Sequence, residues 1–553
     1  MAVSQEADVE RGPMPDAAPG LDYDVLIIGA GISGMYQLHL LRQLGLRVRV
    51  FEAGTGVGGT WYWNRYPGAR FDSESWSYGY SFDQELLDEW DWTEHFSPQP
   101  ETERYLNRFA DKFDLRRDIT FQARVAAARW DDAAQCWTLT LEDGSRHTAR
   151  FLVTAVGPLS APTYPRLPGL GDFMGEAWHT GLWPKHTVDF TGKRVAVIGT
   201  GASAVQAIPE IAKTAGHLTV FQRRPNWCTP LHNAPIDRAE MAEIRSRYPQ
   251  IFERCRETAA CFVHTADQRG TFEVSDEERE AFWEKRYAEP GFGIWQGNFR
   301  DVLIDRAANA LLSEFVARKI RQRVTDPVVA DKLIPKDHGF GTRRVPQETG
   351  YYETFNRPNV ELVSILDTPI QWITATGLET SAGAFDFDMI VYATGFDAIT
   401  GSLDRIDIRG AGGRALKERW KGGLETCLGV MVDGFPNLFM VMGPHTALGN
   451  IPRSIEYNVE WIAGLLFHMT GRGLSVAEPR PQAVAEWTAF VKKKGEGLLS
   501  NEVDSWMTGV NLNVEGKQVR TIARYSGTAP EYREWCDNVA AGGYRELALD
   551  AAP

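Results

Sequence analysis

Short apolar runs followed by glycines open two similar units in this chain. Residues 25–28 are continuously apolar and end at a glycine, which is typical of a buried parallel strand. Apolar positions over 35–42 then recur at helical spacing, and the run over 47–52 predicts a second strand. The same order of strand, glycine turn, helix and strand recurs over residues 193–221. The pattern therefore predicts two strand–helix–strand units of about thirty residues each.

Two further apolar runs, over residues 151–155 and 389–393, each end in a turn of small residues. Their similarity predicts that the chain leaves the first unit near residue 157 and returns to it near residue 388. Residues 226–340 differ, because they are rich in charged residues and mostly helical in pattern. We therefore expect a helical insertion in the second unit.

These elements predict an α/β fold with two Rossmann-like dinucleotide-binding domains and a helical insertion. Strands that alternate with helices at this spacing favour a parallel sheet in each domain. The predicted divisions are a disordered tail over 1–20, a first domain over 21–157 and 388–545, a second domain over 166–225 and 341–387, and the insertion over 226–340.

Composition narrows the classes of function. The 553 residues are 43% hydrophobic and 24% charged, which are ordinary values for globular domains. Lys and Arg number 59 against 73 Asp and Glu, and the net charge is −14. We expect no nucleic-acid partner, because phosphate binding needs a positive surface. No apolar run approaches the length of a membrane span, so we also expect no membrane association.

The cysteines and the first residues bear on the compartment. None of the six cysteines forms a Cys-x-x-Cys pair, and no zinc or dithiol motif is present. A chain of this length needs no disulfides to fold, so we expect a cytoplasmic protein without a metal. The first twenty residues carry several acids and three prolines and lack an apolar run, which is typical of a disordered tail and not of a signal peptide.

The first glycine turn has the spacing Gly-x-Gly-x-x-Gly and lies between a predicted strand and a predicted helix. Gly29 permits the tight turn, Gly31 lets the backbone approach a pyrophosphate, and Gly34 allows the helix to pack closely on the strand. Glu52 ends the second strand, where a carboxylate can accept hydrogen bonds from ribose hydroxyls. The first unit is therefore predicted to bind a dinucleotide.

The second glycine turn differs in two ways that bear on its ligand. Its third position is Ala204, which the motif permits, and Gln222 replaces the acid at the end of the next strand. Arg223 and Arg224 follow directly, and a guanidinium suits a ribose that carries a 2′-phosphate. We predict that this unit binds NADP, with a solvated pair of surface arginines as the alternative. The residues assigned to this site are Gly199, Gly201, Ser203, Arg223 and Arg224.

Two dinucleotide sites in one chain point to electron transfer. They indicate a flavin that is reduced by NADPH. Because the chain lacks a Cys-x-x-Cys pair, we expect the electrons to reach an acceptor other than a disulfide. Molecular oxygen is the acceptor that we expect.

A longer motif lies just before the second glycine turn. Its spacing is Phe-x-Gly-x-x-x-His-x-x-x-Trp-Pro, and its members are Phe173, Gly175, His179, Trp183 and Pro184. This motif resembles the signature of the type I Baeyer–Villiger monooxygenases, and the chain is similar to the phenylacetone and cyclohexanone monooxygenase group over residues 20–545. The resemblance implies FAD in the first domain and NADPH in the second. It also implies that His179 lies in a hinge between domains and affects the handling of NADPH.

Further segments extend the resemblance. Residues 58–68 look like the family's second flavin-contacting segment, and residues 505–509 resemble a late loop over nicotinamide and substrate. Residues 70–72 and 340–344 look like the segments that supply an active-site carboxylate and two basic residues. The residues implied are Gly59, Thr60, Trp61 and Tyr66 for the flavin, Asp72 for the carboxylate and a cofactor contact, Arg343 for the NADP phosphate, Arg344 for the reaction beside the flavin, and Trp506 for the loop.

The resemblance implies a C4a-peroxyflavin that inserts one oxygen atom next to a ketone carbonyl and yields an ester or lactone. Arg344 would stabilise the negative charge, with Asp72 as its ion-pair partner. The implied partners are a small-molecule ketone and O2, and the implied assembly is a monomer or weak oligomer. Two alternatives stay open, an enzyme that oxygenates mainly sulfur or nitrogen and a redox-silent flavoprotein used for binding or regulation. Pro158 and residues 444–448 depart from phenylacetone monooxygenase beside the implied substrate site, so the substrate itself is not carried over.

Overall fold

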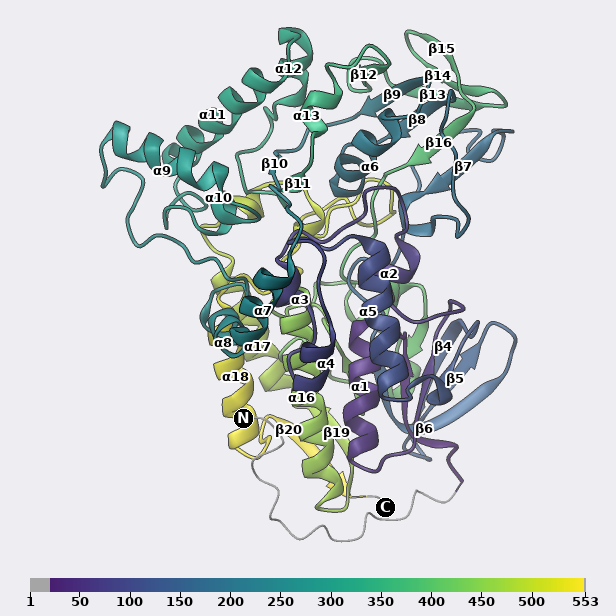
Figure 1. Ribbon diagram of the computed structural model, residues 1–553. Helices are drawn as coiled ribbons and strands as arrows, with labels where there is room; N and C mark the ends of the chain where they lie inside the picture. Colours follow the sequence, from purple (N-terminus) through teal and green to yellow (C-terminus); the bar gives the residue numbers. More distant parts are fainter. Residues whose placement is uncertain (1–19, 552–553) are drawn as a thin grey trace.

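The computed structural model describes residues 20–551 (Figure 1). The predicted tail over 1–20 lies outside these residues, apart from Gly20. Each of the two units is built around its own sheet, the first in the lower half of Figure 1 and the second in the upper half. Among the residues described, no helix combines the length and the apolar character that crossing a membrane requires.

The first unit contains a mixed eight-stranded sheet in the order β17-β4-β5-β6-β1-β2-β3, with β18 paired to β6 beside this path. The pairs from β6 through β1 and β2 to β3 are parallel, whereas β5 runs antiparallel to both of its neighbours. The run predicted at 151–155 lies at the end of β6 and pairs with β1, as expected. The strands are β1 (Tyr23–Ile28), β2 (Val48–Phe51), β3 (Ile119–Thr120), β4 (Val125–Asp131), β5 (Cys136–Leu141), β6 (Arg146–Thr154), β17 (Asp407–Arg409) and β18 (Leu438–Met440).

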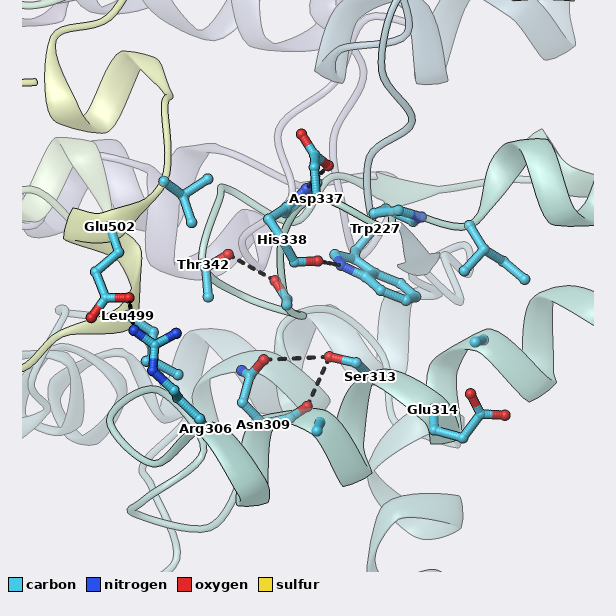
Figure 2. Close-up of a pocket in the computed structure, with 16 residues that line it drawn as sticks. Trp227, Arg306, Asn309, Ser313, Glu314, Asp337, His338, Thr342, Leu499 and Glu502 are labelled. Carbon is cyan, nitrogen blue, oxygen red and sulfur yellow. Dashed lines mark hydrogen bonds and ion pairs between the residues drawn. The ribbon is translucent and has the colours of Figure 1, made fainter. Parts of the chain in front are cut away.

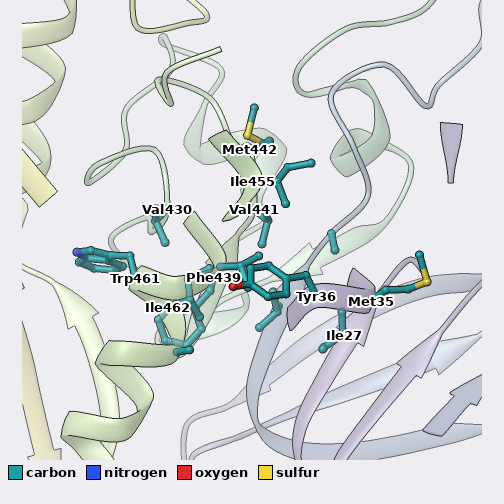
Figure 3. Packing of buried hydrophobic residues seen from close by; sticks show 14 of the residues in the cluster. Ile27, Met35, Tyr36, Val430, Phe439, Val441, Met442, Ile455, Trp461 and Ile462 are labelled. Atoms are coloured by element: carbon teal, nitrogen blue, oxygen red, sulfur yellow. The ribbon is translucent and has the colours of Figure 1, made fainter. Parts of the chain in front are cut away.

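Helices α1 and α16 cover one face of this sheet and close the largest core. Figure 3 shows Tyr36 of α1 beside Phe439 of β18, and Ile455 and Ile462 of α16 belong to the same cluster. This packing fixes the start of α1, and with it the first glycine turn, against the sheet. The helices are α1 (Ile32–Gln43), α2 (Thr60–Trp63), α3 (Ser75–Tyr78), α4 (Gln84–Glu89), α5 (Gln99–Lys112), α14 (Gly401–Asp404), α15 (Leu416–Arg419), α16 (Ile451–Thr470), α17 (Pro481–Lys494) and α18 (Ala529–Ala541), and β19 (Leu474–Pro479) pairs with β20 (Leu547–Ala551).

The second unit has a five-stranded parallel sheet in the order β12-β9-β8-β16-β7. Helix α6 follows β8 through the second glycine turn, so the predicted strand–helix–strand unit is present. A small antiparallel sheet, β13-β14-β15, is attached to it. The elements are β7 (Glu176–His179), β8 (Arg194–Ile198), α6 (Ala202–Ala212), β9 (His217–Gln222), α13 (Tyr351–Thr354), β12 (Val360–Ser364), β13 (Ile370–Thr374), β14 (Gly377–Thr380), β15 (Gly383–Asp386) and β16 (Met389–Tyr392).

The prediction that the chain is back in the first unit at residue 388 is wrong. Strand β16 pairs with β8 and β7 and therefore belongs to the second sheet. All four of its residues are buried, and a continuous apolar run fits an inner position of either parallel sheet. The first sheet regains the chain only at β17, which pairs with β4.

The predicted insertion is helical, but it divides between the two cores. Met241 of α7 and Tyr248 of α8 pack into the first core, whereas Trp283 of α9 and Phe315 of α11 pack into the second. Figure 1 shows α9 to α12 beside the second sheet and α7 and α8 lower down. The elements are β10 (Thr229–Pro230), α7 (Arg238–Ser246), α8 (Tyr248–Glu257), α9 (Asp276–Ala288), α10 (Gly293–Gln296), α11 (Arg306–Arg323), α12 (Pro327–Leu333) and β11 (Gln347–Glu348), which pairs with β10.

Candidate functional site

The first glycine turn has no room for a side chain at Gly29 or at Gly34. Gly29 has a φ of +102°, and a Cβ there would lie 2.6 Å from the carbonyl oxygen of Ala155. A Cβ at Gly34 would lie 1.8 Å from the carbonyl oxygen of Gly29. Helix α1 begins directly after Gly31 without a side-chain cap, so its first N–H groups are available to an anion.

The predicted second flavin segment lies against this turn. A Cβ at Gly59 would meet the Cα of Gly31 at 2.8 Å, and the N–H of Gly58 donates to the carbonyl of Ala30 at 3.0 Å. Thr60, exposed at the start of α2, and Trp61, buried beside it, follow at once. Two glycine segments that face each other this closely form a cradle for a dinucleotide backbone, and the residues present fit FAD.

Glu52 is buried beside the same turn, as the sequence predicts. Its Oε2 accepts from the N–H of Ala30 at 2.8 Å, and its Oε1 accepts from the N–H of Gly54 at 2.7 Å. Burial raises the pKa of this carboxyl. Each carboxylate oxygen retains a second lone pair, so these backbone contacts, which the sequence does not reveal, orient the group and leave acceptor capacity for ribose hydroxyls.

The second glycine turn repeats the geometry with more space. Gly199 has a φ of +111°, and a Cβ there would lie 2.4 Å from the carbonyl oxygen of Ala393. A Cβ at Gly201 would meet nothing within 4 Å. Helix α6 starts after Gly201 without a side-chain cap, and Ser203 lies in its first turn. This turn is therefore open to a pyrophosphate.

Three arginines gather at the end of β9. Desolvation and then the guanidinium of Arg224 lower the pKa of Arg223, and desolvation lowers that of Arg343, on which Arg224 also acts. Asp337 compensates them in part, 3.3 Å from Arg343 and 3.6 Å from Arg224. Arg224 and Arg343 share one carboxylate, and Arg223 lies close enough to both for their charges to lower its pKa. This donor set fits the dianionic 2′-phosphate of NADP.

Arg344 and Asp72 form an ion pair across the two units. Arg344 Nη2 lies 2.6 Å from Asp72 Oδ2, and the side chain of Arg344 is 30% exposed whereas that of Asp72 is 1% exposed. The N–H of Gln347 also donates to Asp72 Oδ2, at 3.1 Å. Asp72 follows α2 in the first unit, and Arg344 lies between α12 and β11. The arrangement leaves the guanidinium partly exposed while the carboxylate that holds it is buried.

Sequence reasoning missed Gln206, which contacts the covered carboxylate. Its Nε2 donates to Asp72 Oδ1 at 3.3 Å and to the carbonyl of Arg70 at 2.9 Å, and its Oε1 accepts from the hydroxyl of Tyr66 at 2.8 Å. Tyr66, assigned to the flavin from the sequence, therefore also contacts the second unit. The one available signal was a glutamine on α6 soon after the glycine turn.

The segment that carries Arg343 and Arg344 is anchored on the insertion. Asn309 of α11 donates to the carbonyl of Phe340 at 2.9 Å, and Ser313 accepts from the N–H of Phe340 at 2.9 Å. A cavity of about 440 Å³ lies between α11, residues 334–342 and residues 499–503 (Figure 2). His338 and Asp337 lie on the same turn (Figure 2), and His338 Nδ1 is 2.7 Å from Asp337 Oδ1. Helix α11 thus fixes the position of the backbone that carries Arg343 and Arg344.

The hinge motif lies along β7 and the turn that follows it. His179 is buried, its Nδ1 accepts from the N–H of Gly181 at 2.9 Å, and burial lowers its pKa to about 4. The ring is neutral at working pH and plays no acid–base part. Phe173 packs on Gly175, where a Cβ would meet its ring at 2.5 Å, and Trp183 is buried in the second core just before Pro184.

Lys185, directly after the motif, contacts the first unit and was not foreseen. Its Nζ donates to Thr55 Oγ1 at 2.6 Å and to the hydroxyl of Tyr62, and it lies 4.2 Å from the centre of the Tyr62 ring. These contacts connect the motif to the flavin segment.

The late loop is ordered by its own caps. Ser505 and Thr508 form a reciprocal capping pair around a single turn, η5 (Trp506–Thr508). Trp506 packs on the apolar group of Ala398, Ile399 and Ala523. The predicted role of Trp506 over the nicotinamide stays a prediction.

The part of the chain that is described contains neither a disulfide nor a candidate metal site. The six cysteines are free and buried. Within residues 20–551, no cluster of three or more His, Cys, Asp or Glu side chains is placed to hold a metal ion.

Known proteins resemble this chain over nearly its whole length. The flavin-binding monooxygenase-like family model matches residues 23–233. The 2-oxo-Δ3-4,5,5-trimethylcyclopentenylacetyl-CoA monooxygenase of Pseudomonas putida is 47% identical over 97% of this chain and 100% of its own. The acetone monooxygenase (methyl acetate-forming) of Gordonia sp. (strain TY-5) is 41% identical over 95% of this chain and 99% of its own. The phenazine N-monooxygenase PhzNO1 of Lysobacter antibioticus is 41% identical over 96% of this chain and 98% of its own. The crystal structure of OTEMO in complex with FAD and NADP matches with a TM-score of 0.92 and 46% identity, over 96% of this chain and 99% of that chain.

Proposed function

Because this chain belongs to the flavin-binding monooxygenase-like family and, within it, to the Baeyer–Villiger monooxygenases, we propose that Arg344 and Asp72 form its reaction centre. The enzyme contains FAD, depends on NADPH and uses O2 to insert one oxygen atom next to a ketone carbonyl, which yields an ester or lactone. The observation that carries the assignment of residues is the 2.6 Å ion pair between a partly exposed guanidinium and a covered carboxylate.

The two glycine turns hold the cofactors in this proposal. Gly29, Gly31 and Gly34 admit the FAD pyrophosphate at α1, and Glu52 takes the ribose hydroxyls. Gly199, Gly201 and Ser203 hold the NADP pyrophosphate at α6, and the cluster of Arg223, Arg224 and Arg343 holds the 2′-phosphate. When bound, NADPH supplies the hydride and the flavin supplies the activation of O2.

Arg344 stabilises negative charge at the reacting oxygen. A guanidinium stays charged at any working pH and donates in a fixed planar fork, so it needs no reorientation as charge builds up. One edge of the fork is held by Asp72, and the 30% exposure of Arg344 leaves the other donors for the substrate side. Asp72 itself is covered, so it acts by orienting Arg344 and does not touch the ketone.

A substrate panel tests this function. Purified enzyme with NADPH under air is given cyclic, linear and aryl ketones, and each product is identified by mass and by incorporation of isotopically labelled oxygen gas. Esters or lactones that carry one labelled oxygen atom, formed at the expense of NADPH, are the expected result. NADPH consumption that yields only hydrogen peroxide with every ketone would contradict it.

A second candidate activity is oxygenation of nitrogen or sulfur. It is favoured by one observation, the phenazine N-monooxygenase that is 41% identical to this chain. The same panel therefore includes a thioether and an aromatic nitrogen heterocycle. An N-oxide or sulfoxide formed faster than any ester would make this the main activity.

Three further proposals complete the assignment. The FAD domain comprises residues 21–157 and the chain after β16, the NADP domain comprises 166–225 and 341–392, and 226–340 is an insertion that supports both.

The enzyme acts as a monomer or weak oligomer in the cytoplasm, and its six free, buried cysteines suit a reducing compartment. Trp506 acts at the nicotinamide, and the hinge residues affect the handling of NADPH.

A further inference from the structure

Gln206 connects the helix that starts at the second glycine turn to the reaction centre. We infer that Gln206 is a positioning residue. It holds Asp72, and through Asp72 also Arg344, in a fixed position relative to α6. The inference rests on the proposed function of the Arg344–Asp72 pair. Its basis is a set of contacts, because one side-chain amide reaches Asp72, Arg70 and Tyr66 at once.

The orientation of the amide is fixed by its neighbours. The hydroxyl of Tyr66 donates to Gln206 Oε1 at 2.8 Å, and burial raises the pKa of Tyr66 to about 12, so this donor keeps its proton at working pH. The carbonyl of Arg70 accepts from Nε2 at 2.9 Å and can only be an acceptor. The NH2 group therefore has to face Asp72, and its second proton is directed at Asp72 Oδ1.

Both oxygens of Asp72 are then held from different elements. Oδ1 receives the amide of Gln206, and Oδ2 receives Arg344 and the N–H of Gln347. A carboxylate with donors on both oxygens cannot rotate without losing one of them. Removal of the Gln206 donor frees Oδ1 to turn, and the oxygen that faces Arg344 turns with it. A covered carboxylate that loses a donor is also left under-satisfied, which is costly.

The backbone around Gly68 packs directly on α6, which brings the loop that carries Asp72 close to Gln206. Gly68 has a φ of +80°, and a Cβ there would lie 2.4 Å from the carbonyl oxygen of Gln206. The loop that carries Tyr66 and Asp72 is thus pressed directly onto the helix. Because α6 begins directly after Gly201, Gln206 in its second turn lies close to the NADP turn and also contacts the active-site carboxylate.

The test compares three variants of this network with one control. Gln206→Leu removes the donor at similar volume, Gln206→Glu replaces the donor with an acceptor, and Tyr66→Phe frees the amide to flip. The control is Gln37→Leu on α1, because Gln37 is a buried glutamine whose amide has no hydrogen-bond partner among residues 20–551. Loss of that amide should leave activity unchanged.

Two readouts separate positioning from general damage. In both Gln206 variants, FAD content and the anaerobic rate of flavin reduction by NADPH should stay within about threefold of wild type, while ester formed per NADPH consumed falls about tenfold or more. Tyr66→Phe should lower ester formed per NADPH consumed by a smaller factor. Crystal structures of wild type and Gln206→Leu should show a longer or divided Arg344–Asp72 contact in the variant. Wild-type coupling together with an unchanged ion pair in Gln206→Leu would overturn the inference.

The results also distinguish failure of this inference from failure of the proposed function. If wild-type enzyme oxygenates no ketone, the proposed function fails. The crystallographic comparison then still decides whether Gln206 holds the ion pair, since it needs no turnover.

Discussion

Arg344 Nη2 lies 2.6 Å from Asp72 Oδ2, yet only the arginine reaches solvent. The two residues come from different units. The pair therefore forms only when the segment over 340–344, which is hydrogen-bonded to α11, and the loop after α2 are both in place. A covered ion pair is costly to break from one side, because the remaining charge is left uncompensated. This asymmetry explains why the two residues should not be equivalent when they are replaced.

Arg344→Ala should separate reduction from oxygenation. The variant should still bind FAD and accept hydride from NADPH, because neither step needs a cation at this position. Ester formation should fall about 100- to 1,000-fold, as when a preorganised donor is removed from a charged transition state. Rapid-mixing absorbance of the flavin, beside product analysis, measures both halves. An ester yield equal to wild type would show that Arg344 is the wrong residue.

Asp72→Ala should give a milder form of the same defect. Asp72 orients Arg344 without touching the substrate, so the guanidinium stays present but less well held. Asp72→Asn should be milder again, because its oxygen can still accept from the N–H of Gln347. The ratio of ester formed to NADPH consumed ranks the variants, and a loss larger than that of Arg344→Ala would contradict this order.

Arg223→Ala should weaken the preference for NADPH. One charge-assisted contact to the 2′-phosphate is lost, which costs about ten- to a hundredfold in KM for NADPH. NADH lacks that phosphate, so its KM should change little. Arg343→Ala should act in the same direction, because both guanidinium groups belong to the same cluster. Equal effects on the two nucleotides would remove the assignment of this cluster.

Gly34→Ala should abolish stable FAD binding. The added Cβ would lie 1.8 Å from the carbonyl oxygen of Gly29, so the turn has to open. The matched control is Ala204→Gly in the second turn, where a methyl group is already tolerated. Flavin absorbance per chain after purification gives the result. A fully yellow Gly34→Ala protein would show that the first turn does not hold the flavin.

The local patterns in the sequence predict local geometry well and long-range partners poorly. The glycine turns at Gly29 and Gly199 and the strand before each one follow from apolar runs and spacing. The strand at β16 was assigned to the wrong sheet, because a fully apolar run carries no information about its neighbours. Gln206 and Lys185 escaped prediction for the same reason, since their partners lie in the other unit.

Glu460→Gln should change how stability depends on pH. Glu460 Oε1 accepts from the hydroxyl of Tyr36 at 3.0 Å, and desolvation together with the nearby Glu456 raises the pKa of Glu460 from 4.5 to about 7. The folded protein therefore binds this proton more tightly than the unfolded chain. As the pH rises from 4.5 to about 7, the group increasingly destabilises the fold, by up to about 3 kcal/mol.

Glutamine keeps an acceptor for Tyr36 but carries no charge, so this contribution disappears. Wild type and Glu460→Gln should unfold at closely similar urea concentrations at pH 4, below the unfolded pKa, and the variant should withstand more urea at pH 8. Urea midpoints of FAD-loaded protein across this range give the comparison. Glu534→Gln, at an exposed position on α18, controls for loss of a carboxylate elsewhere. Parallel pH profiles for wild type and Glu460→Gln would mean that Glu460 is already ionised in the folded protein at pH 5.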